Sequence, residues 1–564
     1  MLAFVFLTCC KHSANILPEV RVRLPQDPEN INPVTYTNIH GLQIIQLLFQ
    51  SLLHTSGTQA RLDPLLADSL PIIQRSDTAV LITYRLRPEA QWDNGIPVTS
   101  RDVNFSMKVI KCPLLNNEKL RIRYEAVKAV LTDTSDYAAV TFVCDKNTAD
   151  PVRLTGALFI LPLHIYDPEN RLKPFTLQNL TTHADSLKNN TAIKAYAAWF
   201  GNESINRKSR LFNGSGGYTL TGWRTGQYVT LEKKDKWWVN TLMPKPGYLT
   251  ANPAKIKFQI IPENSTALQA LRNNIIDVYS NIPANDFLQL TQDPDFKKRF
   301  TSYIPETYDF TYIGINSRFE KFNSRLTRQA LAHLINIPSI IQVTQRNFAT
   351  RTVGPIKPDD KFYNKHIKLY DYNPQKAVQL LQQAGWKKTE GGWAKIMKEV
   401  KIPLEITMQY RAGNTEHETI ALIFKQAADQ VGIPVEIQAV EGGMLADNLR
   451  SHNFEMFIRG ISGSPAEYDY KSILYTESAG EGGNNYTGFG TAESDSLIEA
   501  INHAGDASKA KYLLRFQEVL YEEANPIFLY TVKNRIAVNK RLTNTQLTAS
   551  KYGYDVSAFT FSSN

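Results

Sequence analysis

The chain has 564 residues, of which 43% are hydrophobic and 21% charged, and it carries a formal net charge of +9. This composition is that of a globular protein, and one hydrophobic core stops growing near about 250–300 residues, so we expect two or three lobes. The sequence has no run of five or more Lys or Arg and no nucleic-acid-binding motif, which argues against nucleic acid as a partner.

The N-terminus has features of an exported protein. Residues 2–7 are apolar, and the run from Leu7 to Cys10 resembles a bacterial lipobox, whose final Cys becomes lipidated. Cys10 fits best and Cys9 is the alternative. A signal peptide has a basic stretch before its apolar one, and none is present here, which a truncated start would explain. We expect residues 1–10 to be a lipoprotein signal peptide and residues 11–18 a tether.

The next segment predicts a strand and a helix. Residues 20–25, VRVRLP, suit an extended strand. Residues 39–53 have apolar side chains at helical spacing, at Leu42, Ile45, Leu48 and Leu52.

Residues 79–110 predict a strand, a tight turn and a capped helix in immediate succession. Apolar and polar residues alternate from Val80 to Arg87, and Pro88 ends the strand. Asn94-Gly95 tolerates the positive φ that a chain reversal needs. Thr99 then caps a helix, with Asp102 three residues later as an imperfect capping box.

A glycine-rich loop opens the segment 213–238. Glycines at 214, 216 and 217 permit tight backbone geometry before a hairpin. We exclude a phosphate-binding loop, because no GK[ST] follows and strands come next. A strand over 255–261 and a helix capped by Ser265 are expected after the hairpin.

Residues 371–440 predict a helix followed by a β–α–β unit. Asn373 caps the first helix, Pro374 occupies its first position and Gly385 ends it. A strand beginning at Leu404, a long helix ended by Gly432 and a strand from Val435 to Val440 follow, and their crossover should be right-handed.

At least five stretches, in the same order, resemble the family 5 extracellular solute-binding proteins, the peptide- and nickel-binding receptors of bacterial ABC importers. The most specific is TYRLRPEAQWDNGIPVTSRDVNFS, residues 83–106, which aligns with the family's signature region without a gap. The other stretches are residues 39–53, 213–238, 312–342, 371–386, 484–500 and 516–542.

The resemblance implies an α/β, periplasmic-binding-protein-like (type II) two-lobed fold with an additional inserted lobe and a cleft between lobes. We expect residues 19–63, 213–300 and 526–564 to form lobe I. Residues 64–212 would be the inserted lobe II, and residues 301–525 would be lobe III.

The function implied by the resemblance is that of an extracytoplasmic receptor of an ABC transporter. It would bind peptides in the cleft, deliver them to permease subunits, need no cofactor and act as a lipid-anchored monomer in the periplasm or at the cell surface. Oligosaccharides, metal chelates or other small solutes are the alternative ligands. An exported hydrolase that uses this fold is a remote alternative.

Peptide receptors of this family present an Asp to the amino terminus of the ligand, in a segment that corresponds here to residues 459–474. Aligned from Gly460, Ser464 takes the position of that Asp, and the nearest acids are Glu467 and Asp469. Either one of these two acids binds the amino terminus from a shifted loop, or the ligand lacks a free amine.

Other residues are cleft candidates by their position in the sequence. Arg411 follows the strand 404–410 and could pair with a ligand carboxylate. The remaining candidates are Tyr36, Asn213, Gly214, Asn485 and Tyr486.

The sequence gives little support for an enzyme or for a metal-binding protein. No GxSxG, HExxH, P-loop or GxGxxG pattern stands in a credible context, and the 10 His are scattered, so His54, His164, His333 and His417 are interpreted as structural or exposed. Cys112 and Cys144 could form a disulfide in an exported protein or remain buried thiols, and their spacing decides neither.

Overall fold

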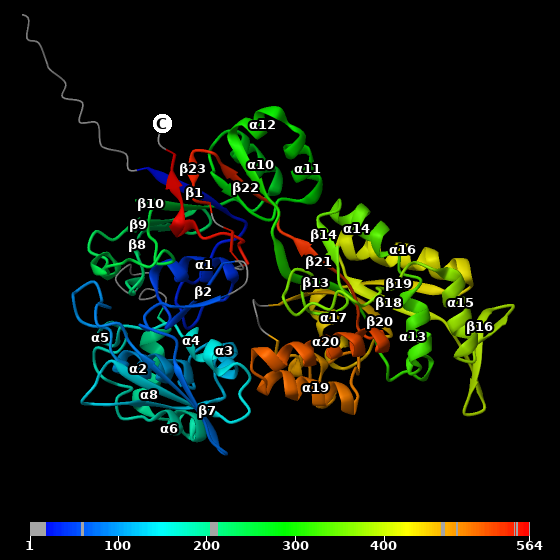
Figure 1. Ribbon diagram of the computed structural model, residues 1–564, viewed down its shortest axis with the longest axis horizontal. Helices are drawn as coiled ribbons and strands as arrows, with labels where there is room; N and C mark the ends of the chain where they lie inside the picture. Colours follow the sequence, from blue (N-terminus) through cyan, green and yellow to red (C-terminus); the bar gives the residue numbers. More distant parts are fainter. Residues whose placement is uncertain are drawn as a thin grey trace, which may run out of the picture.

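The computed structural model describes residues 18–57, 61–202, 212–463, 468–480, 483–545, 547–548 and 551–562. Two halves lie side by side in Figure 1, with the blue to green part of the chain on the left and the yellow to orange part on the right. Helices α10 (Asn264–Arg272), α11 (Ala284–Gln292) and α12 (Pro294–Arg299) lie above the gap between these halves.

A seven-stranded sheet joins strands from both ends of the chain. Its order is β12-β22-β11-β1-β10-β9-β8. The central strand β1 (Glu19–Leu24) runs parallel to β10 (Lys255–Ile260), and Val20 and Val22 are fully buried. The remaining strands are β8 (Tyr218–Arg224), β9 (Tyr228–Lys233), β11 (Val278–Tyr279), β12 (Phe300–Tyr303) and β22 (Ile536–Asn539). The predicted strand at 20–25 and the predicted hairpin after the glycines are therefore confirmed.

A four-stranded antiparallel sheet of order β4-β5-β7-β6 lies in the same half. Its strands are β4 (Ile72–Arg75), β5 (Ala79–Arg85), β6 (Val127–Thr132) and β7 (Ala139–Asp145). Helix α2 (Ser100–Lys111) begins directly after Thr99, whose backbone N–H donates to Asp102 Oδ2 at 2.9 Å, so the strand, the turn and the capped helix are confirmed. One hydrophobic cluster unites this sheet with the seven-stranded one.

Short helices complete this half. Helix α1 ends at Leu48, earlier than the helical spacing through Leu52 predicts, and Phe49 is already extended. The helices are α1 (Ile39–Leu48), α3 (Glu118–Arg123), α4 (Pro151–Gly156), α5 (Leu163–Tyr166), α6 (Leu177–Thr182), α7 (Ala184–Leu187) and α8 (Thr191–Phe200).

A six-stranded sheet of order β14-β21-β13-β20-β18-β19 forms the base of the other half. Its strands are β13 (Glu306–Ile315), β14 (Ala349–Arg351), β18 (Ile406–Arg411), β19 (Val435–Val440), β20 (Met456–Ser462) and β21 (Ile527–Lys533). Ile313 and Ile315 pack with one set of helices, α13 (Arg325–Ala332), α14 (Ile337–Gln345), α15 (Pro374–Gln383) and α16 (Thr415–Val431). Phe310 and Tyr312 on the opposite face pack with α17 (Gly442–Arg450).

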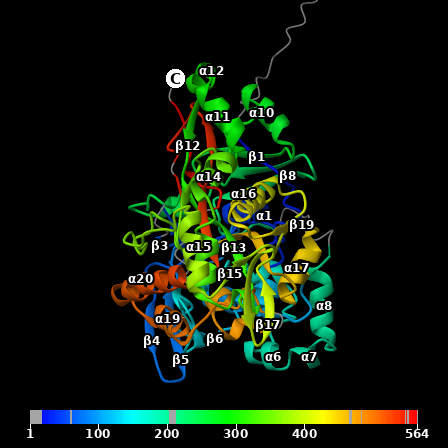
Figure 2. The ribbon, with the colours of Figure 1, turned by 90° about the vertical axis from the view of Figure 1, so that its right-hand side faces the viewer.

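The predicted β–α–β unit is confirmed, because β18 and β19 run parallel and α16 connects them. Figure 2 turns this half toward the viewer and shows α15 and β17 in front. The outer elements are β15 (Lys387–Thr389), β16 (Gly392–Met397), β17 (Val400–Pro403), α18 (Lys471–Leu474), α19 (Ala492–His503) and α20 (Asp506–Glu523).

The C-terminal part of the chain enters both sheets. Strand β21 pairs with β13 and β14 in the six-stranded sheet, and β22, which begins three residues later, pairs with β11 and β12 in the seven-stranded sheet. We expected all of residues 526–564 in lobe I, so β21 is a correction to that assignment. The predicted lobe boundaries are otherwise untested and stay a prediction.

Two smaller expectations also have an outcome. Helix α10 begins at Asn264 with Glu263 as its N-cap, so the expected cap at Ser265 is wrong. Cys112 and Cys144 are both buried free thiols in the structure, which decides between the two alternatives that the sequence left open.

Candidate ligand-binding site

A cavity of about 780 Å³ lies between the two halves. One wall comes from the half with the seven-stranded sheet, and includes α1, residues 147–150 and the C-terminal residues 551–557. The other wall comes from the half with the six-stranded sheet, and includes Tyr468, Asn502 and Lys509. Small-molecule sites in proteins have volumes of about 300–1,000 Å³ and lie preferentially between domains. The cavity is therefore the candidate ligand-binding site.

Helix α1 and the glycine-rich loop form one part of this wall together. The backbone N–H of Gly216 donates to the carbonyl of Leu48 at 3.0 Å, where α1 ends. A Cβ on Gly216 would lie 2.4 Å from the carbonyl oxygen of Leu47, so only glycine permits this approach. The contact brings Tyr218, the first residue of β8, to the cavity.

Aromatic side chains are frequent in the lining and come from both halves. Such side chains offer large apolar faces, and Tyr and Trp add a polar group at one edge. They are Tyr36, Phe49, Tyr124, Phe159, Tyr218, Trp237, Tyr248, Tyr468, Tyr552 and Tyr554.

Three acids line the cavity, and their surroundings differ. Asp150 caps α4 and lies 3.2 Å from Arg153 Nε. Asp469 is exposed, and its Oδ1 accepts from Asn502 Nδ2 at 3.0 Å. Asp555 is half-buried, and its Oδ1 accepts from the backbone N–H of Ser557 at 2.9 Å.

The cavity also has basic groups. Arg123, Lys509 and Lys551 line it, and no carboxylate of the described residues forms an ion pair with any of them. They can therefore interact with carboxylates of a ligand. Burial lowers the pKa of His54, although the nearby charges of Asp555 and Asp63 partly oppose this effect, so the neutral imidazole is favoured at neutral pH.

A second cavity of about 200 Å³ adjoins the first, because Gly463, Tyr468 and Asp469 line both. Tyr308 and Phe310 give this smaller cavity an aromatic wall. The Tyr468 hydroxyl donates to Asp360 Oδ2 at 2.8 Å at its edge. A ligand in the main cavity could place a side chain there.

The structure brings two of the predicted site residues, Tyr36 and Asp469, to the main cavity. Asn213 and Gly214 do not line it. Asn213 Oδ1 accepts from Thr219 Oγ1 at 2.8 Å, and the Gly214 carbonyl accepts from Lys234 Nζ at 2.6 Å. These two residues support the loop that carries Tyr218.

Arg411, Asn485 and Tyr486 also lie outside the lining. Arg411 is exposed, and its Nε would lie 3.2 Å from a Cβ on Gly442 at the start of α17. Asn485 is fully buried, and its Nδ2 donates to the carbonyls of Tyr475 and Phe489. The ring of Tyr486 lies beneath Arg459, 5.4 Å from its guanidinium carbon. Ser464, Glu467 and Cys10 lie outside the described residues.

Sequence reasoning missed His54, Tyr218 and Asp555, which all line the cavity. His54 was interpreted as structural or exposed, because a lone His gives no pattern. Tyr218 had a usable signal, since it directly follows the three glycines. Asp555 had none, because it lies in an irregular segment, and His54 and Tyr218 on the same cavity are hundreds of residues away in the chain.

Neither a metal site nor a membrane span is found within the described ranges. In these ranges, His, Cys, Asp and Glu form no group of three or more that could hold a metal ion. No helix there has the length and apolar character needed to cross a bilayer.

Comparisons with known proteins agree on one family of folds. Residues 61–483 match the middle region of the bacterial extracellular solute-binding proteins, family 5. The oligopeptide-binding protein AppA of Bacillus subtilis (strain 168) is 25% identical over 566 residues, which cover 96% of this chain and 94% of AppA.

Two solved structures show the same arrangement. AppA from Bacillus subtilis in complex with a nonapeptide has a TM-score of 0.67 and 23% identity, with 97% of this chain and 99% of that chain covered. NikZ from Campylobacter jejuni in complex with Ni(L-His) has a TM-score of 0.67 and 20% identity, with 96% of this chain and 99% of that one covered. The predicted two-lobed α/β fold is thereby confirmed.

Proposed function

Since the chain belongs to the bacterial extracellular solute-binding proteins of family 5, we propose that it binds peptides between its lobes and delivers them to the permease of an ABC importer. One observation carries the proposal: a cavity of about 780 Å³ is lined by residues of both halves. A ligand there would contact both lobes at once, so binding would favour their closed arrangement.

Peptides are the ligands that the cavity and the relatives favour together. AppA is an oligopeptide-binding protein by name, and its solved structure contains a nonapeptide. The lining combines aromatic faces with acids and with three basic groups that form no ion pair with a described carboxylate, which suits a chain that has a positive and a negative end. The adjoining cavity of about 200 Å³ would accept a side chain.

A metal chelate is the second candidate ligand, because NikZ was solved with Ni(L-His). A chelate brings its own metal ligands, so the receptor needs only groups that contact the chelator. An oligosaccharide or another small solute remains an alternative of the same class. A solute-binding receptor needs no catalytic group, and we propose no enzymatic activity, no cofactor and no nucleic-acid partner for this chain.

Native mass spectrometry of the purified protein, before and after unfolding and refolding, tests the ligand class. We expect heterogeneous added masses that fragment into amino acids, and their loss after refolding without ligand. A single discrete added mass, or binding only when nickel–histidine or sugars are supplied, would contradict peptide binding and favour the second candidate.

We propose further that the protein is a lipid-anchored monomer at a bacterial membrane, with Cys10 as the lipidated residue. The lipid anchor is supported by the apolar residues 2–7 and by the lipobox-like run from Leu7 to Cys10. Expression in a bacterium with a radiolabelled fatty acid should label the wild type and the Cys9→Ser variant but not Cys10→Ser. Label on Cys10→Ser but not on Cys9→Ser would move the anchor to Cys9, and no label on any of them would overturn the proposal.

A further inference from the structure

Three polar groups from distant parts of the sequence line the main cavity. His54 lies on β2 (Leu53–Ser56), Tyr218 begins β8 and Asp555 caps the short 3-10 helix Val556–Ala558. The charge of Asp555 acts on both of the others: it partly opposes the lowering of the His54 pKa and adds to the raising of the Tyr218 pKa by burial. Asp555 therefore lies close enough to His54 and to Tyr218 for its charge to act on both.

The hydroxyl of Tyr218 has no hydrogen-bond partner in the described part of the chain. Its side chain is only 1% exposed, and no described residue forms a hydrogen bond with the hydroxyl oxygen. A buried hydroxyl in this condition destabilises a protein, because it has lost its water and gained nothing in return. Since Tyr218 lines the cavity, a polar group of a bound ligand would satisfy it.

One carboxylate oxygen of Asp555 accepts no hydrogen bond from the described residues. Oδ1 accepts from the backbone N–H of Ser557 at 2.9 Å and from Ser557 Oγ at 2.7 Å. Oδ2 receives no hydrogen bond from any described residue, and Asp555 is half-buried. The other two acids of the cavity are less suitable, because Asp150 already faces Arg153 and Asp469 is exposed to solvent, where charge pairs are weak.

We propose that Asp555, Tyr218 and His54 bind the α-ammonium group of the ligand peptide. An ammonium group has three N–H donors, and the cluster offers three acceptors: a carboxylate oxygen, a phenolic oxygen and the unprotonated nitrogen of a neutral imidazole. The bond to the carboxylate is charge-assisted and is stronger in a partly enclosed site than in water.

The family resemblance predicts that the segment 459–474 binds the amino terminus of the peptide. In our assignment the amino terminus is bound on the opposite side of the cavity. Ser464 takes the position of the acid that binds the amino terminus in the family. In our assignment Asp555, from the C-terminal segment of the chain, supplies that acid instead. The inference rests on the proposed function, since it specifies which end of a peptide this wall contacts.

The test is a competition between free and N-acetylated forms of the same synthetic nonapeptides, isotopically distinguished and detected by native mass spectrometry. We expect the wild type to retain the free forms at least tenfold better. Asp555→Asn should lose this preference, because an amide oxygen still serves Ser557 but the charge is gone. The matched control Asp469→Asn should keep it.

The possible results test the inference and the proposed function separately. Equal retention of free and acetylated peptides by the wild type would overturn the inference alone, as would loss of the preference in Asp469→Asn but not in Asp555→Asn. Retention of neither form by the wild type would overturn the proposed function and the inference with it.

Tyr218→Phe gives an independent readout. Because no described residue forms a hydrogen bond with the hydroxyl, its removal should leave the Tm of the ligand-free protein unchanged or higher. The affinity for free peptides should fall about threefold to tenfold, as expected for one lost hydrogen bond. A Tm that falls by several degrees together with unchanged affinity would show that the hydroxyl is structural, and would overturn its place in the cluster.

Discussion

Asp277 shows how a single buried charge holds the two ends of the chain together. Its side chain is fully buried and accepts hydrogen bonds from Arg21 Nε at 2.9 Å and from Arg541 Nη2 at 2.6 Å. Burial alone would raise the pKa of Asp277, but the hydrogen bonds from Arg541 and Arg21 outweigh it and hold the pKa below the ordinary value. The ionised carboxylate therefore stabilises the junction of β1, β11 and the C-terminal segment.

Asp277→Asn should lower the free energy of unfolding by about 2–3 kcal/mol at pH 7, because two partly exposed arginines lose their shared partner. A lowered pKa contributes stability that is present above the pKa of the unfolded chain, near pH 4, and is lost as the pH falls through the folded value. The difference in the free energy of unfolding between the variant and the wild type should therefore be constant from pH 5 to 7 and shrink below about pH 4.

Urea unfolding at several pH values measures this difference. Asp295→Asn is the control, because the side chain of Asp295 forms an exposed pair with Lys298, and its loss should change the free energy of unfolding by less than about 1 kcal/mol. Equal effects of the two substitutions would contradict the role of Asp277.

The two cysteines should be inert in the folded protein. Burial raises the pKa of Cys112 to about 11 and that of Cys144 to about 12, and only the thiolate reacts with alkylating agents. Iodoacetamide at pH 8 should leave both residues unmodified in the native protein and modify both after unfolding, as read by peptide mass spectrometry. Rapid native modification, or a disulfide-linked peptide that contains both residues, would contradict the structure.

For single residues, the sequence predicted roles in backbone structure better than roles in the cavity. Thr99 and Asp102 act three residues apart, so the capping box was readable. Tyr36 was predicted from its position in the sequence and Asp469 from the family resemblance, whereas His54 and Asp555 reach the cavity only through long-range packing. No local pattern records such packing, because periodicity reports only on the faces of one element.

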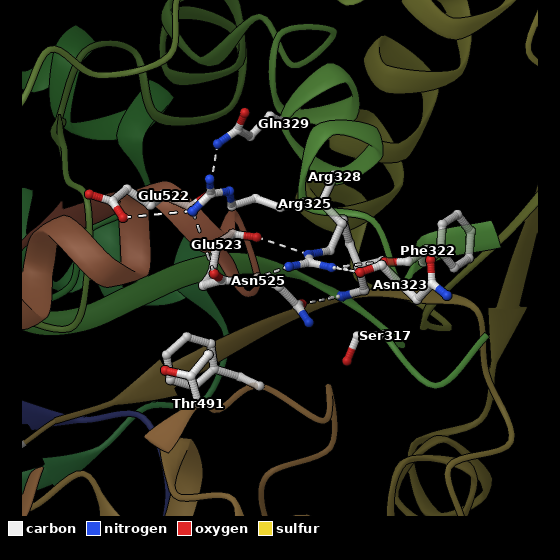
Figure 3. A network of polar contacts seen from close by, with 12 residues as sticks. Ser317, Phe322, Asn323, Arg325, Arg328, Gln329, Thr491, Glu522, Glu523 and Asn525 are labelled. Carbon is white, nitrogen blue, oxygen red and sulfur yellow. Dashed lines mark hydrogen bonds and ion pairs between the residues drawn. The ribbon is translucent and has the colours of Figure 1, made fainter. Parts of the chain in front are cut away.

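Among the elements, α13 is joined to the end of α20 by a buried arginine, Arg328. Figure 3 shows Arg328 between Glu523 on one side and the carbonyls of Phe322 and Asn323 on the other. Its Nη2 donates to Glu523 Oε2 at 2.6 Å, and its side chain is 6% exposed. The neighbouring Arg325 is 53% exposed and lies 3.8 Å from Glu522 Oε2.

Arg328→Met should therefore destabilise the half with the six-stranded sheet by about 3–5 kcal/mol, because it leaves Glu523 and the carbonyls without their donor. Arg325→Met should cost less than about 1 kcal/mol, since exposed ion pairs contribute little. The first transition in urea unfolding, followed by circular dichroism, compares the two. A larger effect of Arg325→Met would show that the helices are held together in another way.

The elements themselves were largely predictable where their ends carry polar caps or glycine. Asn373 caps α15 through a bond from Lys376 N to its Oδ1 at 2.9 Å, and Gly385 follows the helix with a φ of +88°. The start of α10 was misplaced by two residues. There Ser265 has no role as a cap, and Asn264 Oδ1 accepts from Arg23 Nη2 at 3.1 Å.

For the whole molecule, the path of the C-terminal segment is the feature that the sequence did not reveal. Strand β21 lies in one half, β22 lies in the other, and residues 551–557 then form part of the cavity wall. A segment that passes between the halves and lines the cavity is well placed to couple ligand binding to their relative movement. The predicted lobes treat it as part of lobe I, because sequence patterns do not reveal which sheet a strand joins.

Small-angle X-ray scattering of the protein with and without the peptides that co-purify tests the account most directly. Because the cavity is lined from both halves, a bound peptide should draw them together, and the radius of gyration should fall when peptide is added at saturation. An unchanged radius of gyration, with peptide binding verified in the same sample, would contradict closure of the two halves on a peptide.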